Sequence, residues 1–146
     1  MYQLASERPS MLSLIYVSTA SPALERAKVE ALAARAAAAN AELRLTGLLV
    51  WNTRHFMQLL EGDSRTIHAL MERIGSDTRH RDIAFLRHEE RQSRECPDWY
   101  MQALETPLAG AGSASDFAAR LPADMGADTR LLFTSFASAL KPLPMA

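Results

Sequence analysis

The sequence predicts a single α+β domain whose sheet is covered by helices on both faces. Three observations lead to this class. Strand-like runs and two helical segments follow one another in the order β-α-β-β-α-β-β. One of the strand-like runs is apolar on both faces, so the sheet has to be covered twice. The chain has 146 residues, which is enough for one domain with a real core and too few for two.

The first strand and the first helix are expected in the N-terminal third. Residues 1–10 form a polar leader, and residues 12–17 are a short apolar run typical of a buried strand. Ser21-Pro22 predicts the start of a helix, with serine as N-cap and proline at the first helical position. This helix is rich in alanine and extends to about Asn40.

The face that this helix turns inward is expected to carry small side chains. At helical spacing they are Leu24, Ala27, Ala31, Ala34 and Ala38. Such a face suits ordinary close packing of a helix on a sheet, and it also suits a flat molecule that approaches the backbone closely. The pattern alone leaves both open.

Residues 45–61 predict a β-hairpin. Two strand-like runs, 45–51 and 55–61, are joined by the short turn Asn52-Thr53-Arg54. In the first run, alternation places Leu45, Leu49 and Trp51 on one face and Leu48 and Val50 on the other. This strand is the one that needs a cover on both sides.

The second helix is expected to begin after Gly62, where Asp63 predicts an N-cap, and to end near Gly75. Its amphipathic stripe consists of Ile67, Leu70, Met71 and Ile74. Further strands are expected at residues 83–89 and 99–104, with a turn around Pro97-Asp98 between them. The complete order is that of a ferredoxin-like fold with both helices on one face.

The C-terminal residues are expected to cover the other face of the sheet. Residues 106–115 have the composition of a linker, and helices are expected at 116–121 and 128–140. The longer helix carries a stripe of Leu132, Phe133, Phe136 and Leu140. The expected organisation is therefore a leader at 1–10, a core domain at 11–105, and a linker with helices at 106–146.

Composition argues against several classes of function. Sixteen Lys and Arg against 17 Asp and Glu give a net charge of −1, which disfavours the basic surface of a nucleic-acid-binding protein. Acidic residues interrupt the arginine-dense stretch from Arg79 to Arg94, which predicts a solvated strand and loop. No apolar run reaches the roughly 18 to 20 residues that span a bilayer. We expect a cytoplasmic protein that binds neither nucleic acid nor membrane.

The sequence also lacks recognisable catalytic and metal motifs. Cys96 is the only cysteine, so neither an internal disulfide nor a thiolate metal cluster can form. The four histidines lack the i, i+4 spacing of a helical zinc site, and both a nucleophile elbow and a glycine-rich phosphate loop are missing. We therefore expect no metal and no enzymatic activity.

Two polar residues lie within apolar strands. Tyr16 is in the first strand, and Gln58 lies inside Phe-Met-Gln-Leu-Leu. Leaving a buried amide unpaired costs about 1 to 3 kcal/mol, so Gln58 needs partners. Taken alone, Gln58 suits a structural glutamine bonded to nearby backbone, and Tyr16 suits a core aromatic residue with a satisfied hydroxyl.

Six short motifs then occur in one order along the chain. They are Tyr16-x-Ser18, Asn40, Thr46-Gly47-Leu48-Leu49, Phe56-x-Gln58-x-Leu60-Glu61-Gly62, Asp77-x-Arg79-His80 and Trp99-x-Met101. Together they resemble the BLUF family, the blue-light sensors that use flavin, over about residues 11–104. The resemblance implies a non-covalently bound flavin between the two helices, usually FAD, with FMN or riboflavin as the other forms.

The resemblance implies roles for three residues of the photochemical site. Tyr16 would donate an electron and a proton to the photoexcited flavin. Gln58 would bridge Tyr16 and the N5 and O4 edge of the flavin, and its rotation or tautomerisation would redshift the absorption. Asn40 would hydrogen-bond the carbonyl and imide edge of the ring.

Four further residues receive roles in the same way. Arg73 and Asp77 would read the O2 and N3 side of the flavin, although their spacing also suits an ion pair on a helix surface. Trp99 and Met101, which share a face by strand period, would be the switchable pair beside Gln58 that passes the signal to the C-terminal helices. Without the resemblance, both suit plain residues of a sheet core.

Two positions depart from the family pattern. Ala39 replaces the polar residue often found before the asparagine, and Cys96 lies where an aromatic residue is usual.

The expected output follows from length. The residues after the last strand are too few for a cyclase or phosphodiesterase, so we expect a stand-alone photoreceptor that signals through a protein partner or self-association. The alternatives are a flavoprotein or small-ligand enzyme of the same fold without photochemistry, and a structural interaction domain.

Overall fold

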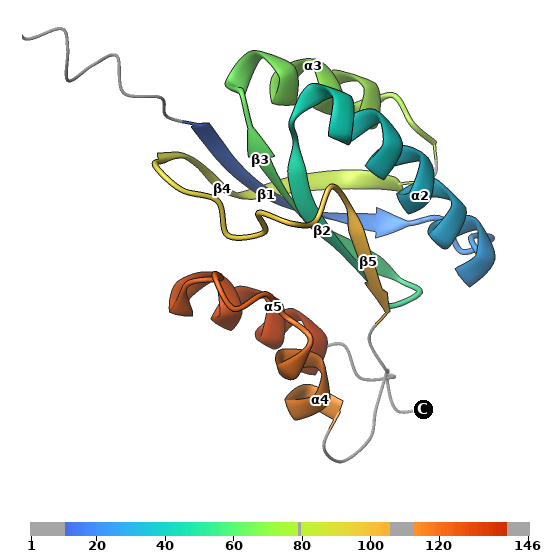
Figure 1. Cartoon of the computed structure of the whole chain (residues 1–146). Helices are drawn as coiled ribbons and strands as arrows, with labels where there is room; N and C mark the ends of the chain where they lie inside the picture. Colours follow the sequence, from blue (N-terminus) through green and yellow to red (C-terminus); the bar gives the residue numbers. More distant parts are fainter. Residues whose placement is uncertain (1–10, 79, 106–112, 140–146) are drawn as a thin grey trace, which may run out of the picture.

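The computed structural model describes residues 11–78, 80–105 and 113–139 (Figure 1). Its strands are β1 (Met11–Ala20), β2 (Thr46–Trp51), β3 (His55–Gly62), β4 (His80–Arg91) and β5 (Gln102–Glu105). Its helices are α2 (Arg26–Leu43), α3 (Ser64–Gly75), α4 (Ser113–Ala119) and α5 (Ala127–Ala139). The predicted leader, most of the predicted linker and Leu140 lie outside the described residues.

The five strands form one mixed sheet in the order β4-β1-β3-β2-β5. β1 pairs antiparallel with β3 and β4, β2 pairs antiparallel with β3, and β5 runs parallel to β2. In Figure 1, α2 and α3 lie on one side of the sheet and α4 and α5 on the other. This arrangement confirms the predicted ferredoxin-like α+β fold with C-terminal helices over the second face.

Alternation along the strands divides the core into two parts, as the hairpin pattern predicts. The α2–α3 face of the sheet includes Leu45, Leu49 and Trp51, packed with Tyr16, Leu60 and Ile67. The α4–α5 face includes Leu48 and Val50, packed with Ile15, Leu59, Phe117 and Phe133. Both covers are needed because β2 is buried along its whole length.

Helix α3 begins and ends where the sequence predicts. The Asp63 carboxylate accepts hydrogen bonds from the backbone N–H groups of Arg65 at 3.1 Å and Thr66 at 3.2 Å. These bonds satisfy donors that the first turn of a helix leaves unpaired. The helix ends at Gly75.

Helix α2 differs from the prediction in its start. It begins at Arg26, one turn later than Ser21-Pro22. The Ser21 carbonyl oxygen accepts from the Leu24 N–H at 3.1 Å, and its hydroxyl oxygen accepts from the Ala23 N–H at 3.3 Å. The serine therefore closes a separate turn before the helix, a common use of this residue.

The predicted inward face is wrong for its four alanines, although Leu24, which lies before α2, does pack against the core. Ala27, Ala31, Ala34 and Ala38 are exposed, whereas Val29, Ala33 and Asn40 are buried. The rotation was misjudged because alanine occurs on every side of this helix and leaves little apolar contrast to define a stripe. Small residues nevertheless face the sheet, because Ala33, Ala36 and Ala37 pack against its core.

β4 and the segment that follows it also correct two predictions. Arg87 is only 9% exposed, so the arginine-dense stretch is not solvated throughout. β5 begins at Gln102, and the residues before it do not follow strand period: Met101 belongs to the core of the α2–α3 face, while Trp99 packs on the α4–α5 face. Backbone bonds outside the ladder hold this segment, including Gly47 N–H to the Trp99 carbonyl at 2.8 Å.

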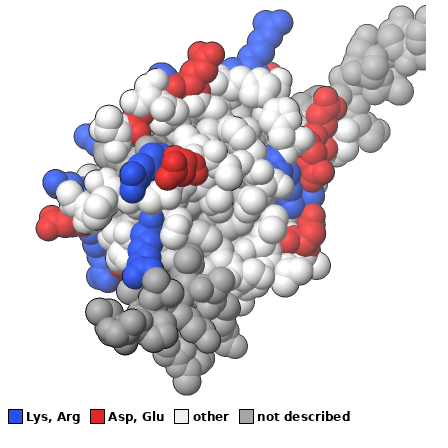
Figure 2. Space-filling view, turned by 180° about the vertical axis from the view of Figure 1, so that it is seen from behind, with Lys and Arg blue, Asp and Glu red and all other residues white. Residues whose placement is uncertain are grey.

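The surface carries charges of both signs. On the face shown in Figure 2, Lys and Arg are interspersed with Asp and Glu, and the described residues of that face show no broad basic patch. Among the described helices, none has the length and apolar character needed to cross a membrane. The described residues also contain no group of three or more side chains suited to a metal ion.

Candidate functional site

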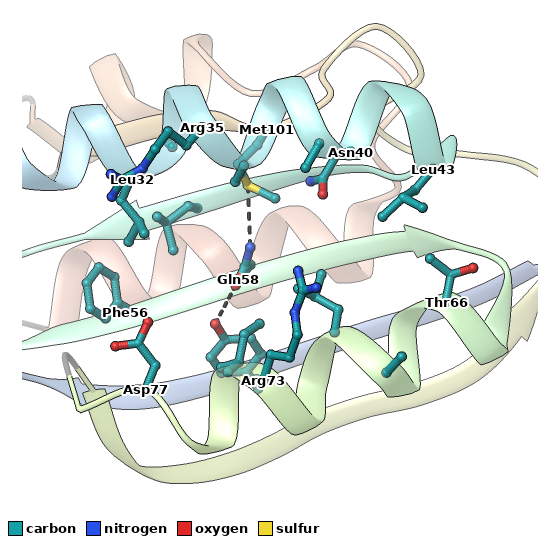
Figure 3. Close-up of a pocket in the computed structure, with 18 residues that line it drawn as sticks. Leu32, Arg35, Asn40, Leu43, Phe56, Gln58, Thr66, Arg73, Asp77 and Met101 are labelled. Atoms are coloured by element: carbon teal, nitrogen blue, oxygen red, sulfur yellow. Dashed lines mark hydrogen bonds between the residues drawn. The ribbon is translucent and has the colours of Figure 1, made fainter.

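A cavity of about 680 Å³ lies between α2 and α3 on the sheet (Figure 3). Its floor comes from the three central strands, with Tyr16 from β1, Leu49 from β2, and Phe56 and Gln58 from β3. Pockets that hold drug-sized ligands and cofactors measure roughly 300 to 1,000 Å³. The cavity is therefore large enough for a cofactor.

Alanine side chains form part of the two cavity walls. They are Ala33, Ala36 and Ala39 on α2 and Ala69 on α3. A methyl group reaches only a short way from the helix backbone, so these walls leave an open slot where longer side chains would fill the space. The slot suits a flat, largely apolar group.

Gln58 occupies the centre of the cavity floor and is 7% exposed. Tyr16 lies directly opposite it in the β1–β3 ladder, and the Tyr16 hydroxyl donates to Gln58 Oε1. Gln58 Nε2 donates to Met101 Sδ at 3.4 Å. The amide is thus bonded to side chains on both ends, and a thioether sulfur is only a weak acceptor.

The Tyr16 phenol is held in its neutral form. Burial raises the pKa of this phenol far above its ordinary value, and the negative charge of Asp77 raises it further. Near neutral pH, Tyr16 therefore keeps its proton. The proton has a path along the hydrogen bond to Gln58 Oε1.

The three other predicted binding residues line the same cavity. Asn40 on α2 is 3% exposed, and its Nδ2 donates to the Tyr100 carbonyl at 2.8 Å, which leaves its Oδ1 as the acceptor for a ligand. Arg73 on α3 and Asp77, just past the end of that helix, both face the cavity (Figure 3). They are lining residues, rather than merely a pair on an outer helix surface.

The predicted signalling pair is divided between the two faces of the sheet. Met101 lines the cavity, while Trp99 packs on the α4–α5 face. Gly47 leaves room for this arrangement. A Cβ at Gly47 would lie 2.0 Å from the Leu59 carbonyl oxygen and 3.3 Å from Met101 Cε.

Sequence reasoning missed several residues that line the cavity. They include Leu32, Arg35, Leu43 and Thr66. A usable signal was present for α2: counting from Asn40 in helical steps reaches Ala36, Ala33, Leu32 and Leu43. The polar residue, and not the alanines, marks the side of the helix that faces the site.

Comparison with known proteins identifies the family. The family described as sensors of blue light using FAD (BLUF) matches residues 11–102. The chain belongs to the BLUF family. FAD is the cofactor of this family, and the domain is a blue-light sensor.

Relatives and solved structures agree with this assignment. The photoactivated adenylate cyclase subunit beta of Euglena longa is 31% identical over 102 residues, which is 68% of this chain and 12% of that protein. The same subunit of Euglena gracilis matches with the same identity and coverage. The chain therefore spans a small part of the length of these curated relatives.

Three solved structures show the same fold. The BLUF domain of BlrP1 has a TM-score of 0.76 and 28% identity, covering 94% of this chain and 97% of that one. Klebsiella pneumoniae BlrP1 with FMN and cyclic diGMP has a TM-score of 0.76 and 29% identity, over 88% of this chain and 34% of that one. BlrB, a BLUF protein in the dark state, has a TM-score of 0.67 and 28% identity, over 91% and 99%.

The cavity of this BLUF domain fits a flavin. Its alanine walls suit the flat ring system, and the Asn40 oxygen provides an acceptor for an imide N–H. Ala39, at a position where the family often has a polar residue, contributes only a methyl group to the wall. Cys96, the other departure, lies fully buried on the α4–α5 face, away from the cavity.

Proposed function

We propose that this BLUF domain senses blue light with Tyr16 as the donor of an electron and a proton and Gln58 as the hydrogen-bond relay. One observation carries the proposal: Tyr16, Gln58 and Met101 form a continuous hydrogen-bonded chain across the cavity floor. Bound flavin supplies a strong oxidant when it absorbs blue light. Side chains of the protein bind the flavin, supply the electron and proton, and rearrange their hydrogen bonds.

Tyr16 and Gln58 handle the proton. Tyr16 Oη holds it in the dark, because burial keeps the pKa of the phenol high. Gln58 Oε1 is the atom that accepts from Tyr16, so loss of an electron from the phenol sends the proton toward the amide. The amide then rotates or tautomerises, and the bond from Nε2 to the Met101 sulfur is the weaker one to give up.

Asn40, Arg73 and Asp77 bind and orient the cofactor in this proposal. Asn40 Oδ1 offers an acceptor, Arg73 a cationic donor, and Asp77 an anionic acceptor, and all three side chains line the cavity. The short alanine side chains of α2 and α3 leave space for the flat flavin ring between the two helices. FAD is the expected flavin, and the fit of FMN in a related structure keeps the shorter cofactor as a second candidate.

The output in this proposal is a protein contact. The domain acts as the sensor, without catalysis of its own, and passes its state from Gln58 through Met101 and Trp99 to the C-terminal helices and then to a partner in the cytoplasm, either another protein or a second copy. Two curated relatives support an effector of this kind, since they are subunits of a photoactivated adenylate cyclase. The proposed sensor unit is residues 11–105, followed by a linker and the helices.

Absorption spectra in darkness and under blue light test the proposal. The flavin-loaded chain should show a reversible redshift. Tyr16→Phe and Gln58→Leu should keep the flavin and lose the shift, because each breaks the hydrogen-bonded chain. Tyr100→Phe and Gln102→Leu are matched controls at exposed positions and should keep it.

Three results would contradict the proposal. A protein that bleaches under light without a redshift would be an ordinary flavoprotein of the same fold. A protein that stays colourless after reconstitution with flavin would be an interaction domain. A redshift of normal size in Tyr16→Phe or Gln58→Leu would remove the roles assigned to these residues.

A further inference from the structure

A charged cluster lies on the α4–α5 face, away from the cavity, with Arg87, Glu95 and Thr129 buried and Asp128 exposed at its rim. We call Arg87, Glu95, Asp128 and Thr129 the Glu95 cluster. The carboxylate of Glu95, 4% exposed, pairs with the Arg87 guanidinium at 3.0 Å. Arg87 also donates to Thr129 Oγ1 at 2.7 Å and to Asp128 Oδ2 at 3.1 Å. The cluster thus joins β4, the segment before β5 and the first turn of α5.

Glu95 holds the beginning of α5 directly. Its Oε2 accepts from the backbone N–H of Gly126 at 2.8 Å, and its Oε1 accepts from the Thr129 hydroxyl at 2.9 Å. The Gly126 carbonyl in turn accepts from the Arg130 N–H at 2.9 Å, the first bond of the helix. A carboxylate at this end is favoured by the unpaired N–H groups and the helix dipole.

The same segment reaches the cavity six residues later, at Met101. Hydrogen bonds fix it along the way. The backbone N–H groups of Glu95 and Cys96 donate to the Glu61 carboxylate at 2.5 and 2.9 Å. The Tyr100 carbonyl accepts from Asn40 Nδ2 at 2.8 Å. A segment anchored at this many points has little slack to absorb a movement at one end.

We propose that Glu95 is a positioning residue that couples α5 to the state of Gln58. Illumination shifts Met101, the segment 95–101 moves with it, and the bonds from Glu95 to Gly126 and Thr129 weaken, so that α5 loosens from the sheet. The proposal rests on the proposed function, in which Gln58 rearranges in the light. A buried charge with several partners suits such a device, because its bonds depend steeply on geometry and packed contacts shift between discrete arrangements.

Hydrogen exchange of the α5 backbone amides in the flavin-loaded full chain tests the coupling. In the wild-type protein, exchange in α5 should be faster under blue light than in darkness. Glu95→Gln keeps the size of the side chain and removes its charge. It should raise dark exchange in α5 by about tenfold or more and abolish the further increase in light. Asp98→Asn, exposed in the same segment, should behave like the wild type.

A second readout separates coupling from a merely structural role. The decay of the redshift in darkness is a property of the cavity, which Glu95 does not touch. Glu95→Gln should change its rate by about twofold or more, as mutations along a coupled path do, and Asp98→Asn should leave it unchanged. If Glu95→Gln does not fold, Thr129→Val removes the two hydrogen bonds that the Thr129 hydroxyl makes with Arg87 and Glu95, and it should shift both readouts in the same directions.

The outcomes distinguish the two proposals. Absence of a redshift in the wild-type chain counts against the proposed function. A normal redshift with no light effect on α5 exchange contradicts the coupling alone. So does a light effect on α5 that is as large in Glu95→Gln, or in Thr129→Val, as in the wild type, since Glu95 would then only fasten the helix.

Discussion

Two buried polar side chains on β3 show how the faces of the sheet differ. Gln58, on the α2–α3 face, is bonded to the Tyr16 hydroxyl and the Met101 sulfur beside a cavity. Glu61, on the α4–α5 face, accepts from Thr46 Oγ1 at 2.9 Å and from the Glu95 and Cys96 N–H groups. A neutral amide with a sulfur partner can exchange a bond at small cost, whereas a carboxylate with three donors cannot.

The packing around these residues follows the same division. The α2–α3 face is lined by alanines and left hollow, while the α4–α5 face is filled by large side chains such as the fully buried Phe133. One face is thus built to hold a ligand and rearrange. The other holds the C-terminal helices to the sheet in darkness.

The largest expected effect is on stability at Glu61. Glu61→Leu should lower the free energy of unfolding by about 3 to 5 kcal/mol, because two buried N–H groups and the Thr46 hydroxyl lose their acceptor. Gln58→Leu should cost only about 1 kcal/mol. Urea unfolding followed by circular dichroism measures both. Equal losses would remove the distinction between a fixed and a rearrangeable site.

A second prediction concerns Gly47 in β2, which lies against the Leu59 carbonyl of β3 and the Met101 side chain. Gly47→Ala should lower the free energy of unfolding by about 3 kcal/mol, because the added Cβ meets the Leu59 carbonyl at 2.0 Å and overpacking has this cost. Gly75→Ala is the matched control, since a Cβ there has no atom within 4 Å. Thermal or urea unfolding compares them, and a tolerated alanine at position 47 would show that β2 and β3 can move apart at this point.

A third prediction tests the hollow face. Ala36→Leu places a larger side chain in the cavity wall and should weaken flavin binding by about tenfold or more, or about 1.4 kcal/mol, with no loss of stability in the flavin-free protein. Ala38→Leu adds the same groups on the exposed side of α2 and should bind flavin normally. Titration with FAD measures both affinities. If Ala38→Leu weakened FAD binding more than Ala36→Leu, the side of α2 that carries Ala38 would face the cavity, as the sequence suggests.

The smallest effect is expected at Asp128, on the rim of the Glu95 cluster. A hydrogen bond from Arg91 holds the pKa of this carboxyl below its ordinary value, and the charge of Arg87 also contributes. Its stabilisation is therefore present above the unfolded pKa of about 4 and is lost as the pH falls through the lower folded value.

Melting temperatures across pH measure this contribution. Asp128→Asn should cost about 0.5 kcal/mol near neutral pH, because the side chain is exposed. The difference from the wild type should disappear in acid. A difference that persists below the folded pKa would show that the carboxylate charge is not its source.

Much of the fold was predictable because its signals are local. The two faces of β2 follow from strand alternation, and the start of α3 follows from Asp63. The start of α2 was missed because Ser21 closes its own turn, and the start of β5 because residues 96–101 are held by contacts from α2 and β2. Those contacts join residues far apart in the chain, so no local pattern reports them.

The site was predictable to a similar degree. Five predicted binding residues line one cavity, and only the family resemblance suggested that they belong together. Arg35 was missed because a charged residue in an alanine-rich helix indicates a solvated position, and this side chain is exposed although it lines the cavity. The buried carboxylates of Glu61 and Glu95 were missed for a related reason: a charged residue in a sequence indicates solvent unless its partners are known, and these partners lie up to 35 residues away.

The direct pairing of Tyr16 with Gln58 across β1 and β3 has a consequence for how the sensor fails. The two side chains are 42 residues apart in sequence, yet no loop sets their separation. The spacing between neighbouring strands sets it, and a slip of one residue would turn one of them to the opposite face. Tyr16 and Gln58 therefore stay in register as long as β1 and β3 stay paired. Heat that separates these two strands also unfolds the domain.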